Sequence, residues 1–280
     1  MPSNDSDCQT NAPASLSPVS FSMMPSAEIS TVFQTLNLLH KKEQQSRLTL
    51  EEAWPQLNRL YEALVTVNAH TNLTRLTDYE TYCARHILDS CLILPYLKDG
   101  FRVADVGSGA GFPAFPLAIF APDVQVMAIE SVGKKAKFIE ETSINLGLEK
   151  RLRSVPQRSE VLCSYQVSEA AKAKGLTSFR EAFDVACARA VSALPLLLEL
   201  CLPLVKVGGH FLALKGPKAD SEIENAQTVL KLLGGKVVSV ERFGDLPILQ
   251  GSVLVVIEKV APTPKVYPRP TAQIKKKMLS

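Results

Sequence analysis

Short apolar runs bounded by glycine, proline or polar residues recur along the chain from residue 101 onward. They predict strands at residues 101–106, 124–129, 151–155, 183–188, 208–214, 236–242 and 251–258. Amphipathic segments between them predict helices near residues 112–121, 132–147, 158–174, 191–205 and 219–233. This alternation is typical of an α/β fold with a mostly parallel sheet. The last two strands have no helix between them and predict an antiparallel hairpin at the sheet edge.

The pattern before residue 100 is helical. Residues 1–27 are rich in Ser, Pro and Asn, which predicts a disordered tail. The sequence leaves open the role of this tail and whether Met1 is the true start of the protein. Apolar residues at helical spacing predict an amphipathic helix over 29–45. Thr49 and Glu52 have the spacing of a capping box and predict the start of a second helix, which the stretch from Asn68 breaks. Asp78 is placed to cap a third helix.

These patterns divide the chain into four parts. The helical region forms a cap packed on the sheet domain, and a basic segment follows that domain. The expected parts are a tail at 1–27, the helical region at 28–99, the sheet domain at 100–260 and the C-terminal tail at 261–280.

The first predicted strand leads into a glycine-rich turn. Asp105 ends the strand, and Gly107, Gly109 and Gly111 follow at alternate positions. Glycines let the backbone turn tightly and approach a ligand, and the following helix presents free amides. The pattern D-x-G-x-G-x-G differs from the dehydrogenase form G-x-G-x-x-G and resembles motif I of class I methyltransferases that use S-adenosylmethionine. A glycine-rich turn without this cofactor is the alternative.

An acidic residue closes the second predicted strand. Glu130 lies about 20 residues beyond the glycine turn, where an acid accepts hydrogen bonds from the ribose hydroxyls of an adenosine cofactor. The alternative is a surface carboxylate that caps the next helix. Lys134 and Lys135 begin that helix, although positive charge is unfavourable at a helix N-terminus. They are candidates for RNA phosphates or ordinary solvated lysines.

Two later strand ends also carry candidate residues. Gln157 to Glu160 follow the third strand, where a methyltransferase sheet holds adenine. Arg189 emerges from the carboxyl end of the fourth strand, where ligands bind in such sheets. A buried arginine needs a partner, so it either faces the cleft or forms a structural ion pair.

Composition narrows the class of protein further. The net charge of +3 does not identify a partner, but Lys and Arg are absent before Lys41, and residues 264–280 hold five basic residues and no acid. Six scattered cysteines have no metal-ligand spacing and suit reduced thiols, so we expect no metal. The chain has no apolar run of about 18 residues and no targeting pattern, and we expect a cytoplasmic protein.

A set of motifs in one order identifies a resemblance. Taken together, they are similar to the bacterial glucose-inhibited division protein B family over about residues 49 to 270. The sequence departs from the family at Ala114, usually Gly, and in the tail at 271–280, which lacks the usual glycine-containing ending. The motifs are Asn72-Leu-Thr74, Arg85-His-Ile-Leu-Asp-Ser90, Asp105 to Pro113, Glu130-Ser131 with Lys134-Lys135, Ala188-Arg-Ala190, Leu214-Lys-Gly216 and Tyr267-Pro-Arg269.

The resemblance implies a Rossmann-like class I methyltransferase. It implies methylation of guanine N7 in the 530 loop of small-subunit (16S) ribosomal RNA, with S-adenosylmethionine as the cofactor. The substrate would be that RNA or the small-subunit particle, with no DNA and no membrane involved, and we expect a monomer. The cofactor contacts that it implies, with the glycine turn included, are Asp105, Gly107, Gly109, Gly111, Phe112, Glu130, Ser159, Glu160 and Arg189.

The chemistry expected from these residues needs no general base. The chain lacks the (D/N)-P-P-(Y/F) sequence of exocyclic-amine methylases, and Cys187 has no preceding proline as in cytosine-C5 enzymes. Guanine N7 has a free lone pair, so catalysis depends on alignment and electrostatics. Arg189, Lys215 and His86 are cleft candidates, although His86 and Asp89 also suit a capped or core pair.

Basic residues suggest how RNA approaches. Lysines after the second and fifth strands share the carboxyl edge of the sheet with the cofactor, where phosphate contacts would supply affinity. Solvated surface lysines are the alternative. The candidates for binding RNA are Lys134, Lys135, Lys215 and Arg269, with Lys265, Lys275, Lys276 and Lys277 of the tail.

Two other functions stay open for the chain: a small-molecule methyltransferase, and a non-catalytic RNA-binding assembly factor.

Overall fold

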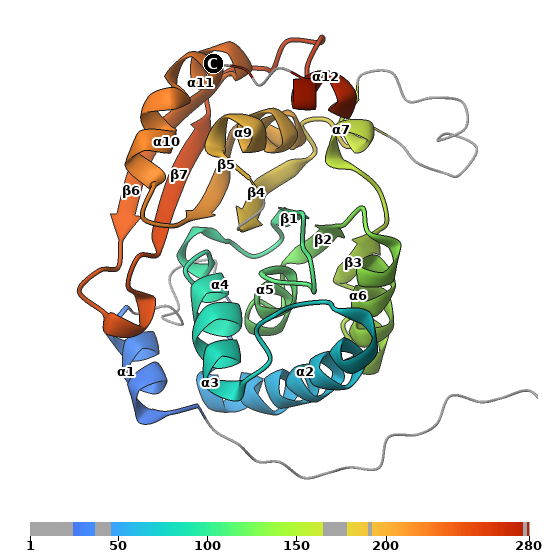
Figure 1. Ribbon diagram of the computed structural model, residues 1–280, viewed down its shortest axis with the longest axis vertical. Helices are drawn as coiled ribbons and strands as arrows, with labels where there is room; N and C mark the ends of the chain where they lie inside the picture. The colour runs from blue at the N-terminus through green and yellow to red at the C-terminus, as the bar shows by residue number, and fades with distance from the viewer. Residues whose placement is uncertain (1–24, 37–45, 165–177, 190–191, 277–278, 280) are drawn as a thin grey trace, which may run out of the picture.

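A computed structural model describes residues 25–36, 46–164, 178–189, 192–276 and 279 (Figure 1). Parts of several predicted segments lie outside the described residues. These parts are most of the N-terminal tail, residues 37–45 of the first predicted helix and residues 165–174 of the helix predicted over 158–174.

A seven-stranded sheet of order β3-β2-β1-β4-β5-β7-β6 forms the centre of the molecule. Neighbours from β3 to β5 are parallel, whereas β7 is antiparallel to both β5 and β6. The predicted mixed α/β sheet with an antiparallel edge hairpin is thus confirmed. The strands are β1 Arg102–Val106, β2 Gln125–Ile129, β3 Leu152–Val155, β4 Phe183–Arg189, β5 Val205–Lys215, β6 Gly235–Arg242 and β7 Val253–Lys259.

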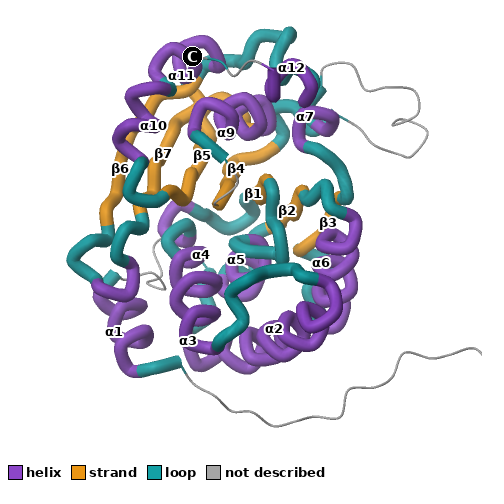
Figure 2. The backbone as a smooth tube through the Cα atoms, in the orientation of Figure 1, coloured by secondary structure: helices purple, strands orange, loops and turns teal. Residues whose placement is uncertain are grey.

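Helices cover both faces of this sheet (Figure 2). One face carries α5 Ala114–Phe120 and α6 Gly133–Asn145, and the other carries α7 Ser159–Leu162, α9 Leu194–Cys201, α10 Ala219–Asn225 and α11 Gln227–Leu233. Short 3₁₀ turns lie at Leu202–Leu204 and Pro247–Leu249, and α12 spans Thr271–Lys276 near the end of the chain.

Some predicted boundaries were wrong. The helix predicted over 191–205 ends earlier, at Cys201, because Pro203 has no amide hydrogen to donate to the carbonyl four residues back. A 3₁₀ turn then leads into β5 at Val205. The strand predicted from residue 208 therefore begins three residues earlier. The helix predicted over 219–233 consists of two helices that meet at Ala226. The helix predicted over 158–174 begins as α7, but α7 ends at Leu162.

The predicted caps of the N-terminal helices are present. The helices are α1 Ala27–Thr35, α2 Leu50–Thr71, α3 Tyr79–Thr81, a π-helix Tyr82–Leu88, α4 Asp89–Cys91 and a 3₁₀ turn Leu94–Tyr96. The Thr49 hydroxyl accepts from Glu52 N at 3.2 Å, and the Glu52 carboxylate accepts from Thr49 N at 2.7 Å. Asp78 Oδ1 accepts from Thr81 N at 2.8 Å. The second helix continues to Thr71, and Asn72 ends it with φ of +49°.

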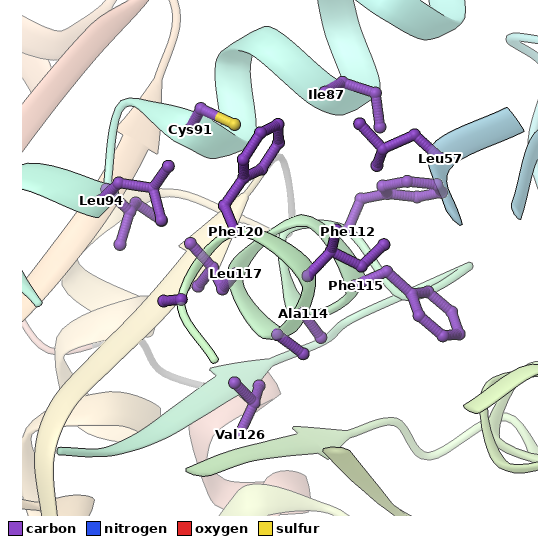
Figure 3. Packing of buried hydrophobic residues seen from close by; sticks show 14 of the residues in the cluster. Leu57, Ile87, Cys91, Leu94, Phe112, Ala114, Phe115, Leu117, Phe120 and Val126 are labelled. Atoms are coloured by element: carbon purple, nitrogen blue, oxygen red, sulfur yellow. The ribbon is translucent and has the colours of Figure 1, made fainter. Parts of the chain in front are cut away.

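The N-terminal helices share one hydrophobic core with α5 and α6 (Figure 3). Phe115 and Phe120 of α5 are fully buried, as are Leu57 of α2 and Ile87 of the π-helix. Leu48 N also donates to Phe120 O at 3.0 Å. These contacts hold the helices before β1 against the sheet.

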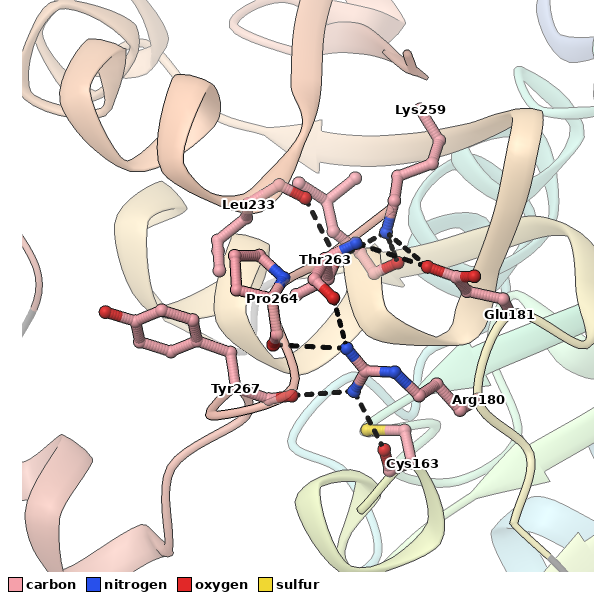
Figure 4. Close-up of polar contacts among 9 residues, drawn as sticks. Cys163, Arg180, Glu181, Leu233, Lys259, Thr263, Pro264 and Tyr267 are labelled. Carbon is pink, nitrogen blue, oxygen red and sulfur yellow. Dashed lines mark hydrogen bonds and ion pairs between the residues drawn. The ribbon is translucent and has the colours of Figure 1, made fainter. Parts of the chain in front are cut away.

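The segment after β7 is held by a buried lysine and a half-buried arginine (Figure 4). Lys259 is fully buried and donates to Leu202 O at 2.7 Å and to the Thr263 hydroxyl. Burial lowers its pKa to about 8, although Glu181 opposes the shift. The Arg180 guanidinium donates to the carbonyls of Thr263 at 2.5 Å and of Tyr267 at 2.7 Å. The segment therefore follows a fixed path along the domain.

Arg269 completes this anchoring. Its side chain donates to both carboxylate oxygens of Glu199, at 2.8 and 2.7 Å, and its backbone amide donates at 2.9 Å. The Glu199 side chain is only 1% exposed, so its charge depends on this arginine.

We therefore expect Arg269→Ala to lower the free energy of unfolding by about 3 kcal/mol, because it leaves a buried carboxylate without its partner. Urea denaturation measures the change. The control is Lys276→Ala on α12, where the lysine is exposed. Equal stability of the two variants would show that the Glu199 pair contributes nothing.

Candidate cofactor site and active site

The glycine turn after β1 lies at the carboxyl edge of the parallel strands. Gly107, Gly109 and Gly111 have φ of +74°, +60° and +89°, which side chains other than glycine rarely adopt. A Cβ on Gly111 would lie 2.3 Å from Cδ2 of Phe115, whereas one on Gly109 would meet only Gly107 O at 4.0 Å. Gly111 therefore permits close helix packing, and Gly109 leaves open space in front of the turn.

Glu130 connects the end of β2 to this turn. Its side chain is buried, with Oε2 accepting from Gly109 N at 2.9 Å and Oε1 accepting from Val132 N at 2.7 Å. The surface position considered as an alternative is therefore wrong, although the bond to Val132 does lie at the start of α6. Each carboxylate oxygen keeps a further lone pair that can accept from a ligand hydroxyl.

Asp105 is a buried acid at the base of the turn. Its Oδ2 accepts from Ala114 N at 3.1 Å, while Oδ1 has no hydrogen-bond partner among the described residues. Burial raises the pKa of this carboxyl to about 7, although the hydrogen bond from the Ala114 amide and the charge of Arg189 oppose the shift. The oxygen without a partner marks a place for a donor from outside the chain.

A second unsatisfied acceptor lies on α7. Ser159 and Glu160 are both buried, and Oε1 of Glu160 has no hydrogen-bond partner in the described part of the chain. Asp105 lies near the carboxyl end of β1 and Glu160 lies on α7 after β3, so both acceptors are at the same edge of the sheet. S-adenosylmethionine carries an ammonium and an adenine amino group, both donors, so the residues present fit this cofactor.

Arg189 joins the sheet to the N-terminal helices. From the end of β4 its guanidinium donates to Nδ1 of His86 at 2.8 Å and to the carbonyl of Arg85. The His86 ring stacks on Phe112 with centroids 4.2 Å apart, and the guanidinium carbon lies 5.8 Å from the Phe112 centroid. The structure thus brings together three residues that the sequence placed on separate elements.

The π-helix makes the Arg85 carbonyl available. The backbone amide of Asp89 donates to Ala84 O, five residues back, instead of the carbonyl four residues back that an α-helix would use. That skipped carbonyl is Arg85 O, which accepts from Arg189. The wider helical turn therefore supplies an acceptor for the buried guanidinium.

The hydrogen bonds fix the protonation of His86. A guanidinium only donates, so Nδ1 of His86 must accept and the ring proton lies on Nε2. Nε2 is 3.3 Å from the Thr74 hydroxyl oxygen. Burial and the charge of Arg189 lower the His86 pKa to about 3. The ring is therefore neutral at ordinary pH, and its basic nitrogen is already occupied.

The structure separates His86 from Asp89. Asp89 Oδ1 accepts from the Ser252 hydroxyl at 3.0 Å, and Asp89 Oδ2 lies 3.9 Å from Arg85. Burial raises the Asp89 pKa. Asp89 thus joins the N-terminal helices to the start of β7, and only His86 lies against the glycine turn.

Two of the basic candidates are engaged in ion pairs. Lys215 is only 7% exposed and lies 2.7 Å from a carboxylate oxygen of Glu222, while it also donates to Ser192 O. Arg269 binds Glu199. Each of these two cations therefore has a carboxylate partner within the chain, and a contact of either one with RNA stays a prediction. Lys134 is exposed and Lys135 half-buried at the start of α6, and their RNA contact stays a prediction.

The sequence analysis included Thr74 in a motif but gave it no role. Its position after the end of a predicted helix was the one available signal, and this position does not indicate a contact with His86, twelve residues later.

The described part of the chain holds no group of three or more His, Cys, Asp or Glu side chains placed to bind a metal. None of its helices is long and apolar enough to cross a membrane.

The chain is similar to proteins of one family. The GidB family model, described as rRNA small subunit methyltransferase G, matches residues 53–248. The curated "Ribosomal RNA small subunit methyltransferase G" of Lactobacillus delbrueckii subsp. bulgaricus is 40% identical over 222 residues, covering 76% of this chain and 86% of that protein. The protein of the same name from Geobacillus kaustophilus is 38% identical, covering 85% and 94%. Among solved structures, a SAM dependent methyltransferase from Aquifex aeolicus matches with a TM-score of 0.49 and 17% identity, over 68% of this chain and 98% of that one.

We expect Glu130→Gln to weaken binding of S-adenosylhomocysteine by about 1–3 kcal/mol, because an amide replaces one acceptor oxygen by a donor. Calorimetric titration measures the dissociation constant. Glu149→Gln, at an exposed glutamate, is the matched control. An unchanged dissociation constant in Glu130→Gln would remove this residue from the site.

The raised pKa of Asp105 predicts a pH-dependent stability difference. Its value of about 7 in the folded chain exceeds the ordinary 3.8, so the native state loses stability as pH rises between these values. The variant Asp105→Asn has no ionisable group at this position. The unfolding free energy of Asp105→Asn minus that of the native chain should therefore be about 2 kcal/mol larger at pH 8 than at pH 5.5. Urea denaturation at both pH values measures this, and a constant difference would contradict the raised pKa.

Proposed function

The chain belongs to the GidB family of rRNA small subunit methyltransferases, and from this premise we propose that it methylates N7 of a guanine in the 530 loop of small-subunit (16S) ribosomal RNA. The observation that carries the proposal is a pair of buried acceptors without partners among the described residues, Asp105 Oδ1 at the base of the open glycine turn and Glu160 Oε1 on α7. Both belong to the edge where the cofactor of an α/β sheet binds.

S-adenosylmethionine supplies an electrophilic methyl group on a sulfonium. Around it, Gly107, Gly109 and Gly111 hold the turn open, and Glu130 offers acceptors to the ribose hydroxyls. Ser159 and Glu160 lie where adenine would be held, and Phe112 and Arg189 border the same turn. These assignments follow the family motif at matching positions and the burial of Phe112, Glu130, Ser159 and Glu160.

The chain's own residues support a direct displacement. Guanine N7 would take the methyl group with its free lone pair while the bond from that methyl to sulfur breaks and S-adenosylhomocysteine leaves, so no proton leaves before the step. His86 suits this chemistry because its neutral ring has its basic nitrogen bound to Arg189 and removes no proton. Arg189 holds the ring against Phe112, which keeps the wall of the cleft in one arrangement. Alignment of the two reacting atoms then accounts for most of the rate.

The helical region at 28–99 acts as a cap over the domain at 100–260 and forms part of the substrate cleft. Lys134 and Lys135 at the start of α6 contact phosphates and add affinity that depends on salt. The substrate is small-subunit RNA or its particle, which places the protein, as a monomer, in the cytoplasm. The C-terminal tail at 261–280 has a structural role through Arg269, and an RNA contact from its exposed lysines is secondary.

Methylation of small subunits tests the function. Subunits from a strain lacking the gene are incubated with the purified protein and S-adenosylmethionine, and N7-methylguanosine is mapped by borohydride-dependent strand cleavage. We expect one new site, in the 530 loop. Gly109→Val is the control, because its strained turn should abolish cofactor binding. Methyl transfer to a metabolite without RNA would identify a small-molecule enzyme, and RNA binding without cofactor binding would identify an assembly factor.

A further inference from the structure

We propose that the Thr74 hydroxyl donates a hydrogen bond to O6 of the target guanine and thereby selects guanine over adenine. This inference rests on the proposed function and names a residue that recognises the substrate. It depends on which hydrogen bonds Thr74 already makes.

The backbone holds Thr74 in a fixed place. Asn72 ends α2 in a left-handed conformation, and the Asn68 side-chain oxygen then accepts from both Leu73 N at 2.7 Å and Thr74 N at 2.9 Å. Leu73 is buried in the core of the N-terminal helices. The Thr74 side chain is consequently positioned before any substrate arrives.

Both lone pairs of the Thr74 hydroxyl have donors. Leu76 N donates to its oxygen at 3.1 Å. Nε2 of His86, 3.3 Å away, carries the ring proton because Nδ1 accepts from Arg189. A hydroxyl has two lone pairs and one proton, and the Thr74 proton has no acceptor among the described residues. Arg189 thus acts through His86 to leave Thr74 as a donor only.

The place of this donor matches the reaction. His86 stacks on Phe112 of the glycine turn and binds Arg189 at the end of β4, so Thr74 lies one hydrogen bond from a ring that packs on the glycine turn. Its side chain is half-buried, so the hydroxyl remains within reach of a substrate.

A donor at this place distinguishes the two purines. Guanine presents two acceptors on its major-groove edge, N7 and O6, whereas adenine presents N7 beside an amino group that donates. N7 must keep its lone pair for the methyl group, so recognition falls to the neighbouring atom. Thr74 can bind O6 of guanine, while against the adenine amino group it would place two donors together, which leaves both unpaired.

Three variants and one altered base test the proposal. Thr74→Val removes the hydroxyl with little change of shape, Thr74→Ser keeps it, and Thr74→Cys supplies a weaker donor. Small subunits are reconstituted with guanine or 2-aminopurine, which lacks O6, at the methylated position. The ratio of kcat/KM for the two bases is measured, together with the dissociation constant of S-adenosylhomocysteine.

We expect the native chain and Thr74→Ser to prefer guanine by about tenfold or more, the size of one hydrogen bond in a buried site. The preference should fall close to the intrinsic reactivity ratio of the bases in Thr74→Val and take an intermediate value in Thr74→Cys. Any loss of kcat/KM that 2-aminopurine causes through contacts other than the one with Thr74 is the same in every variant, so it cancels when the variants are compared.

The same preference in Thr74→Val as in the native chain, with cofactor affinity retained, would overturn the proposal. If Thr74→Val fails to bind S-adenosylhomocysteine, the Thr74→Cys ratio decides: a value equal to the native one overturns the proposal, and a lower one supports it. Failure of the native chain to methylate guanine subunits would instead overturn the proposed function.

Discussion

The guanidinium of Arg189 is the interaction on which the candidate active site depends. A charge at the end of a buried strand needs acceptors, and this one takes them from the N-terminal helices: the Arg85 carbonyl and Nδ1 of His86. The same two bonds set the ring proton of His86 and keep its ring on Phe112. One cation therefore joins the sheet to the N-terminal helices and holds the His86–Phe112 stack between them.

The elements nearest the ligand edge were readable because their patterns are local. Alternating glycines after a buried strand, and an acid at the end of the next strand, each follow from a few consecutive residues. The ion partners of Lys215 and Arg269 were not readable, because Glu222 and Glu199 lie on helices whose rotation about the sheet is set by packing. Thr74 was missed for the same reason, since its role comes from a ring on another helix.

The helix boundaries show a related limit. Leu202-Pro-Leu204 continues an apolar run that suits either a helix or a strand, and the observed change into β5 depends on the proline and on pairing with β4. Asp105 shows the opposite case. Its position was expected, but the cost of burying its charge becomes visible only when Oδ1 is found without a partner. The site thus carries an energetic cost that a bound donor would relieve.

The π-helix places a constraint on the length of the chain between Tyr82 and Leu88. Removing one residue there would restore the ordinary α-helical ladder, which would pair the Arg85 carbonyl with an amide of its own helix. Substitutions in this segment can preserve the cleft, but a deletion cannot, so related chains that keep the site should vary here in sequence and not in residue number.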